Sequence, residues 1–169
     1  MRQSFLLQYI LLLIAQVLIC NYFHFTPYLT LTLLPALILC LPTRLSTAAG
    51  MLIAFVTGIT VDLLAEGVVG LNAFALVPVG LLRRGLVRFV FGEELLVRGE
   101  NFSIHKFGLP KVIFAVFLMQ TVFLVLYIWA DGAPVRPFLF NFWRYFISVA
   151  AGTLLSVVVA DLFTHDDRR

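Results

Sequence analysis

The segment Ala48–Val69 reads AAGMLIAFVTGITVDLLAEGVV and places one aspartate, Asp62, inside a long apolar run. An ionisable side chain at membrane depth costs roughly 2.5–3.5 kcal/mol on insertion scales unless it is paired or solvated. Asp62 therefore indicates one of three things: an interface between helices, a polar cavity or a binding site. The three alternatives lead to different classes of protein.

The composition identifies the class of chain. Of the 169 residues, 62% are hydrophobic and 12% are charged, and the mean hydropathy is +1.02. A soluble domain is about 45–50% apolar and about 25% charged. We therefore expect an all-α integral membrane protein with a single polytopic domain over residues 1–169. The net charge is +3. Basic residues of a membrane protein usually lie in its cytoplasmic loops, so no nucleic-acid partner is expected.

The apolar runs predict a bundle of six transmembrane helices, with spans at about 4–22, 28–41, 47–64, 71–91, 110–130 and 138–163. The second span is short, because a helix needs about 20 residues to cross a bilayer. It is interrupted by Pro35, which predicts a tilted, kinked or partly re-entrant segment.

An even number of spans places both termini on one side of the membrane. With a cytoplasmic N-terminus, only Arg136 and Arg144 fall outside, and the other ten of the 12 basic residues fall inside, as the positive-inside rule requires. The inner set is Arg2, Arg44, Arg83, Arg84, Arg88, Arg98, Lys106, Lys111, Arg168 and Arg169. This topology separates Cys20 from Cys40, so no disulfide is expected between them.

Small residues four positions apart mark a packing face on two of the spans, because they let helix backbones approach closely. The third span carries Gly50, Ala54 and Gly58, and Asp62 is the next position on that face. The sixth span carries Ser148, Gly152, Ser156 and Ala160, and Arg144 is the preceding position.

Asp62 and Arg144 both fall near the outer ends of their spans. We therefore expect the third and sixth spans to pack together, with Arg144 neutralising Asp62 or Glu66. Three roles for Asp62 remain open at this point: a polar contact between helices, a contact with a protein partner, and a ligand or ion site.

A turn is predicted between the third and fourth spans, at Gly67, Gly70 and Asn72. Glycine permits tight backbone geometry, and an asparagine is suited to cap the next helix. Farther along, Leu86–Arg98 mixes aromatic and basic residues. It is interpreted either as an interfacial helix on the inner leaflet or as a docking surface for a cytoplasmic partner.

The motifs of common enzymes are absent from the sequence. It contains no His-Glu-x-x-His pair, no Gly-x-Ser-x-Gly elbow and no phosphate-binding loop ending in Lys-Ser/Thr. No pair of carboxylates lies together at membrane depth for acid–base chemistry. We therefore expect no enzymatic activity, no cofactor and no metal site.

The residues Gly58, Asp62, Gly70, Leu71 and Asn72 form a pattern that resembles the core motif of the rod shape-determining protein MreD family. The resemblance implies a scaffold or regulator of the bacterial elongation machinery in the inner membrane, acting on cell shape and lateral peptidoglycan synthesis without catalysis. It implies MreC, MreB, and RodA with its penicillin-binding transpeptidase as partners, besides membrane lipid.

The MreD fold is similar to that of the substrate-binding subunits of energy-coupling-factor vitamin transporters, which supplies an alternative function. Such a subunit docks on its transport module through alanines of its first helix. Here the first span contains one alanine, Ala15, so the scaffold interpretation is favoured.

Overall fold

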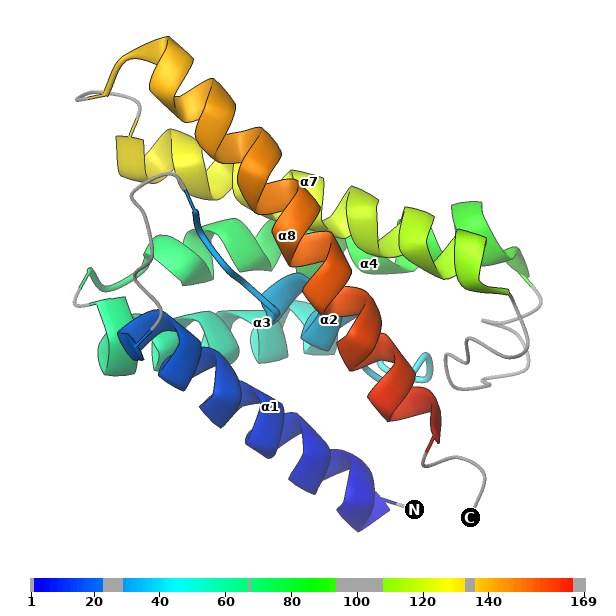
Figure 1. Ribbon diagram of the computed structural model, residues 1–169. Helices are drawn as coiled ribbons and strands as arrows, with labels where there is room; N and C mark the ends of the chain where they lie inside the picture. The colour runs from blue at the N-terminus through cyan, green and yellow to red at the C-terminus, as the bar shows by residue number, and fades with distance from the viewer. Residues whose placement is uncertain (1, 23–28, 67, 94–107, 133–135, 166–169) are drawn as a thin grey trace.

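The computed structural model describes residues 2–22, 29–66, 68–93, 108–132 and 136–165. These residues form a helical bundle (Figure 1) of α1 (Arg2–Tyr22), α2 (Leu34–Leu39), α3 (Thr47–Val61), the π-helical turn η1 (Asp62–Glu66), α4 (Leu71–Phe91), α7 (Leu109–Gly132) and α8 (Phe138–His165). The predicted all-α class is therefore correct for the part of the chain that is described.

Four of the helices are long and apolar enough to cross a membrane. They contain the segments Phe5–Tyr22, Thr47–Ala65, Leu109–Asp131 and Phe138–Ala160. The helix α4 covers the same residues as the predicted fourth span, but three arginines lie in its last nine residues. Their charge lowers its hydropathy, and it is not among the four.

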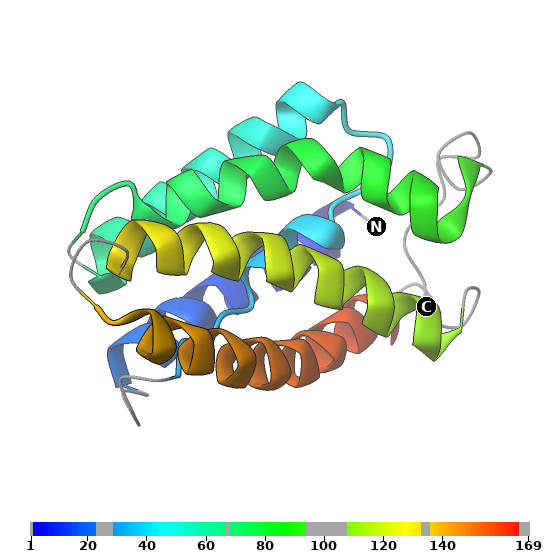
Figure 2. The same cartoon turned by 90° about the horizontal axis from the view of Figure 1, so that it is seen from above.

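The helices α3, α4, α7 and α8 pack in sequence order, each antiparallel to the next. The largest interfaces join α3 to α4, α4 to α7, and α7 to α8, as Figure 2 shows from above. The first helix runs parallel to α3, since the Tyr9 hydroxyl lies 2.7 Å from the Thr57 hydroxyl and Asn21 donates to the Leu64 carbonyl at 3.2 Å. The start of α1 and the end of α8 lie at the same end of the bundle (Figure 1).

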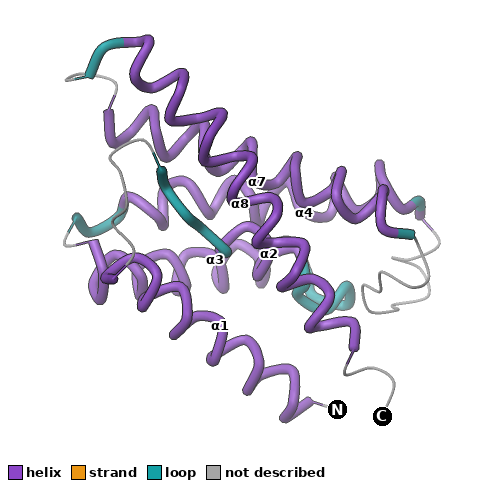
Figure 3. Tube along the Cα trace, viewed as in Figure 1, coloured by secondary structure: helices purple, strands orange, loops and turns teal. Residues whose placement is uncertain are grey.

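The predicted second span is mostly not helical. Residues 29–33 have no regular secondary structure, and only the six residues of α2 form a helix. Pro35 does not interrupt this helix, because it lies in the first turn, where its missing N–H costs nothing. The chain then turns at Pro42 and reaches α3. Figure 3 shows this segment as a loop followed by the short α2 inside the longer helices.

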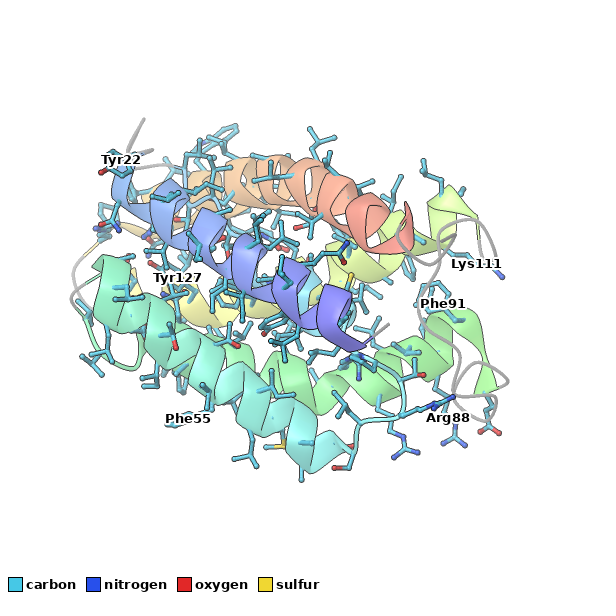
Figure 4. All side chains as sticks on the ribbon, turned by 90° about the horizontal axis from the view of Figure 1, so that it is seen from below. Tyr22, Phe55, Arg88, Phe91, Lys111 and Tyr127 are labelled. Carbon is cyan, nitrogen blue, oxygen red and sulfur yellow. The ribbon has the colours of Figure 1, made fainter. Side chains whose placement is uncertain are left out.

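The core lies around α2, whose six residues are all buried. The buried side chains that surround it include Val79, Met119 and Phe123 of α4 and α7. The outer faces of the long helices carry exposed apolar side chains such as Leu52, Phe89 and Leu154. Tyr22 lies at one end of the bundle, and Arg88 and Lys111 lie at the opposite end (Figure 4).

Candidate functional site

The Asp62 carboxylate is fully buried and bonded to the start of the next helix. Its Oδ2 accepts hydrogen bonds from the backbone N–H of Gly70 at 2.9 Å and of Ala73 at 3.3 Å. Its Oδ1 accepts from the backbone N–H of Asn72 at 2.9 Å and from the Asn72 amide at 3.0 Å. Four donors thus occupy the two oxygens, which together offer about four lone-pair sites.

This arrangement follows from the backbone N–H groups at the start of a helix, which lack acceptors within that helix. The first N–H groups of α4 have no carbonyl within the helix, and the positive end of the helix dipole favours a negative group there. The N-cap residue of α4 is Gly70, which has no side chain to supply the missing acceptor. Asp62, at the start of the wider π-helical turn, supplies it from the neighbouring helix.

Two expectations about the turn are settled by this geometry. Gly70 has a φ of 101°, in the region that favours glycine, so its role as a turn residue is confirmed. Asn72 does not cap α4, because its side chain donates to Asp62 and does not accept from the helix. Gly67 lies outside the described residues, and so does the side chain of Glu66.

The small-residue face of α3 packs on α4. A Cβ added to Gly58 would lie 2.4 Å from the Ala73 Cα, so only glycine allows this approach. One added to Gly80 would lie 3.0 Å from the Gly50 carbonyl oxygen and 3.1 Å from the Ala54 Cβ. The packing face was predicted correctly, and its closest approach places Asp62 directly beside the start of α4.

The predicted pairing of Arg144 with Asp62 is wrong. Arg144 is buried and pairs with Asp131, at the end of α7, and its Nε donates to the Thr30 hydroxyl at 3.1 Å. Its guanidinium carbon also lies 5.8 Å from the centre of the Tyr127 ring. Among the described helices, α8 packs mainly on α7 and α3 packs mainly on α4, so the sixth and third spans do not form the expected interface.

Gly152 was expected on a face that packs against the third span, but it packs against α7. A Cβ at this position would lie 2.2 Å from the Gln120 Nε2 atom of α7. The glycine therefore makes room for a buried glutamine side chain on the neighbouring helix. The stripe is a packing face, as expected, but its partner is α7.

The segment 29–33 is held by polar side chains from three long helices. Gln16 of α1 accepts from the Leu33 N–H at 2.6 Å and donates to the Leu31 carbonyl at 3.3 Å. The Ser148 hydroxyl of α8 accepts from the Thr30 N–H at 2.9 Å. The third contact, from Gln120 of α7 to the Thr32 carbonyl, is longer, at 3.5 Å.

A fourth helix holds the chain farther on, at the end of α2. The guanidinium of Arg83, on α4, is 5% exposed and donates to the carbonyls of Leu39 and Leu41, at the end of α2. Carbonyls at a helix end lack partners within the helix, and a cation there also suits the helix dipole. The sequence analysis counted Arg83 among the basic residues of the inner side, whereas its side chain is part of the core.

These contacts explain how non-helical backbone is accommodated in so apolar a chain. In a bilayer, unpaired backbone groups cost several kcal/mol each, so an irregular segment must be enclosed by protein. Four of the surrounding helices, α1, α4, α7 and α8, each supply a polar group: Gln16, Arg83, Gln120 and Ser148. The polar residues in the apolar runs were the available signal for this site.

The two groups of contacts, at Asp62 and around residues 29–41, hold backbone in place. Asp62 has its acceptor sites filled, and the polar side chains around 29–41 are engaged mainly with backbone. Within the described residues, no group of three or more His, Cys, Asp and Glu side chains is placed to hold a metal ion. Comparison of the chain with known protein families, curated proteins and solved structures finds no match.

Proposed function

We propose that this chain is an MreD-like scaffold or regulator of the bacterial elongation machinery, which acts on cell shape and lateral peptidoglycan synthesis through protein partners. The observation that carries the proposal is that the residues of the family-like motif form one structural unit. Gly58 lets α3 approach Ala73, and Asp62 binds the backbone of Gly70 and Asn72. A motif of this kind fixes a shape that partners recognise.

The proposal includes six membrane crossings in the bacterial inner membrane, with both termini in the cytoplasm. The crossing through 29–41 needs few residues, because an extended residue advances about 3.3 Å and a helical one about 1.5 Å. Residues 29–32 span at most about 13 Å, and Leu33, which has helical dihedrals, adds about 10 Å together with the six residues of α2. The eleven residues therefore cover at most about 24 Å of the ~30 Å hydrocarbon core. The charge partition supports this orientation: without the buried Arg83 and Arg144, nine basic residues fall inside against one outside.

The proposed partners are MreC, MreB, and RodA with its penicillin-binding transpeptidase, together with the lipid around the bundle. Support for action through partners comes from the exposed apolar surface, which includes Phe55, Phe74 and Trp129. At the inner end, Arg84 and Lys111 are exposed and suited to the anionic leaflet. No catalytic step is assigned to the chain.

Affinity purification from detergent-solubilised membranes tests the proposal. The tagged full-length chain is compared with an unrelated tagged membrane protein of similar size, and bound proteins are quantified by mass spectrometry. The proposal predicts enrichment of MreC and of RodA with its transpeptidase. Stoichiometric recovery of an ATP-binding transport module would instead support the vitamin-transporter alternative and contradict the scaffold.

A further inference from the structure

Three polar atoms on α7 and α8 have no hydrogen-bond partner among the described residues. They are the Oε1 atom of Gln120, on α7, and the hydroxyl oxygens of Thr153 and Ser156, on α8. Gln120 and Ser156 are fully buried, and the Thr153 hydroxyl is enclosed as well. Buried polar groups are nearly always hydrogen-bonded, so three such atoms on two neighbouring helices indicate a binding site.

The three residues lie close together where α8 packs on α7 (Figure 2). The Gln120 amide rests on Gly152, because a Cβ at Gly152 would lie 2.2 Å from its Nε2 and 2.9 Å from its Cδ. Oε1 is bonded to Cδ, so the amide oxygen also lies beside this turn of α8. Thr153 is the next residue along the helix, and Ser156 follows Gly152 by about one turn, or ~6 Å of helix axis. A bridging molecule spans about this distance with two hydrogen bonds.

The chemistry of these atoms selects the bound molecule. An amide oxygen only accepts hydrogen bonds, so it needs a donor, whereas a hydroxyl both donates and accepts. Lipid acyl chains carry no donor. Serine and threonine hydroxyls within helices often bond a carbonyl of their own helix, but neither hydroxyl has such a partner in the described part of α8. Water is the smallest molecule that donates and accepts, and a buried water makes about three hydrogen bonds, one for each of the three groups.

We propose that the interface of α7 and α8 binds an ordered water molecule between Gln120, Thr153 and Ser156. The water donates a hydrogen bond to the Gln120 Oε1 atom and bonds the two hydroxyls. The site lies within the membrane-spanning segments of both helices, where an unpaired polar group finds no bulk solvent. The inference does not depend on the proposed function.

The bound water has a role in holding the segment 29–33. The same Gln120 amide donates through Nε2 to the Thr32 carbonyl, at 3.5 Å. An amide whose oxygen is held by water keeps its NH₂ group turned toward Thr32. Thr153 and Ser156 are therefore positioning residues, which act on the segment through the water and Gln120.

Solid-state NMR of the full-length chain in liposomes tests the site. The side-chain amides of the four glutamines are labelled with ¹⁵N, and single substitutions assign their signals. The rate of magnetisation transfer from water protons to each amide is then measured. Gln16 is the internal control, because it is 1% exposed and its Oε1 already accepts from the Leu33 N–H.

We expect the transfer to Gln120 to be roughly threefold faster than the transfer to Gln16, because bound water contacts the Gln120 amide. Ser156→Ala and Thr153→Val each remove one hydroxyl and should slow the transfer to Gln120 roughly twofold, since the water loses one of its about three hydrogen bonds. Ser148→Ala is the matched control on the same face of α8. Its hydroxyl already accepts from the Thr30 N–H, so this variant should leave the Gln120 rate unchanged. Circular dichroism establishes that each variant is folded, and Thr153→Val keeps the shape of the side chain.

Three results overturn the proposal. Equal transfer rates for Gln120 and Gln16 in the unaltered chain show that the interface is dry. A Gln120 rate that either Ser156→Ala or Thr153→Val leaves unchanged places the water outside the proposed site. A higher dodecyl sulfate midpoint for the unfolding of Ser156→Ala shows that the Ser156 hydroxyl bonds nothing, because removing an unpaired buried group stabilises the fold.

Discussion

Replacing Asp62 provides a direct test of its role as the cap of α4. In Asp62→Ala, the buried backbone N–H groups of Asn72 and Ala73 lose their acceptor, as does the half-buried N–H of Gly70. A buried donor without a partner costs ~1–3 kcal/mol. Gly70 is only half-buried, so we count the two buried backbone donors and expect from them a loss of about 4 kcal/mol. The buried Asn72 amide also loses its acceptor, which adds to this loss.

Asp62→Asn is the graded comparison. It keeps one acceptor oxygen, but its NH₂ group faces N–H donors in place of the second oxygen. We therefore expect about half the loss, ~2 kcal/mol. The free energy of unfolding is measured by circular dichroism in mixed micelles of increasing dodecyl sulfate content, with the exposed Leu154→Ala as control. Surface substitutions usually change the free energy of unfolding by no more than ~0.5 kcal/mol. If Asp62→Ala lowers it by no more than this, the carboxylate does not hold the turn.

Three further predictions test the neighbouring contacts. Gly58→Ala should destabilise the bundle by ~3 kcal/mol or more, because its Cβ meets backbone atoms at 2.4–2.9 Å. Gly85→Ala, with nothing within 4 Å, should be neutral or stabilising by up to ~1 kcal/mol, and equal unfolding midpoints for the two variants would refute the close approach. In a double-mutant cycle, the effects of Asp131→Ala and Arg144→Ala on the free energy of unfolding should couple by ~1 kcal/mol or more. The effects of Asp62→Ala and Arg144→Ala should add within ~0.5 kcal/mol. A larger coupling of Arg144 to Asp62 than to Asp131 would support the ion pair between Arg144 and Asp62 instead. Arg83→Met should free the end of α2 and raise the rate of maleimide labelling of Cys40, which is 6% exposed. The control is Arg84→Met, at an exposed neighbouring position, which should leave that rate unchanged. Equal labelling rates in the two variants would exclude Arg83 as the residue that holds the end of α2.

The sequence was sufficient for features that depend on local pattern. The bounds of α4 match the predicted 71–91, because Gly70 and Gly92 adjoin its two ends. The packing face of α3 was also predictable, since small residues four apart need no knowledge of the partner helix. Both inferences use information that lies within one segment.

Features that depend on which helices are neighbours were not predictable. Arg144 was assigned to Asp62 because both were predicted near the outer ends of their spans, but the adjacent helix α7 presents Asp131 instead. Depth in the membrane restricts the possible ion pairs without selecting one. The choice is made by helix adjacency, which single-segment patterns do not encode.

The central segment was missed for a related physical reason. Apolar composition over 28–41 predicts burial, and burial in a bilayer normally implies a helix. Here the backbone is satisfied by side chains from other helices, including Gln16 and Arg83. Arg83 was counted with the basic residues of the inner side, because an arginine inside a helical bundle is uncommon unless its donors are engaged.

Depletion of the chain in the cells that naturally produce it tests the proposed function most directly. Cell width and the incorporation of a fluorescent D-amino acid along the lateral wall are measured together, and expression of the unaltered chain serves as the control. We predict that depleted cells widen and round up and that lateral incorporation falls. Cells that keep their shape and lateral incorporation but lose uptake of a vitamin would contradict the account.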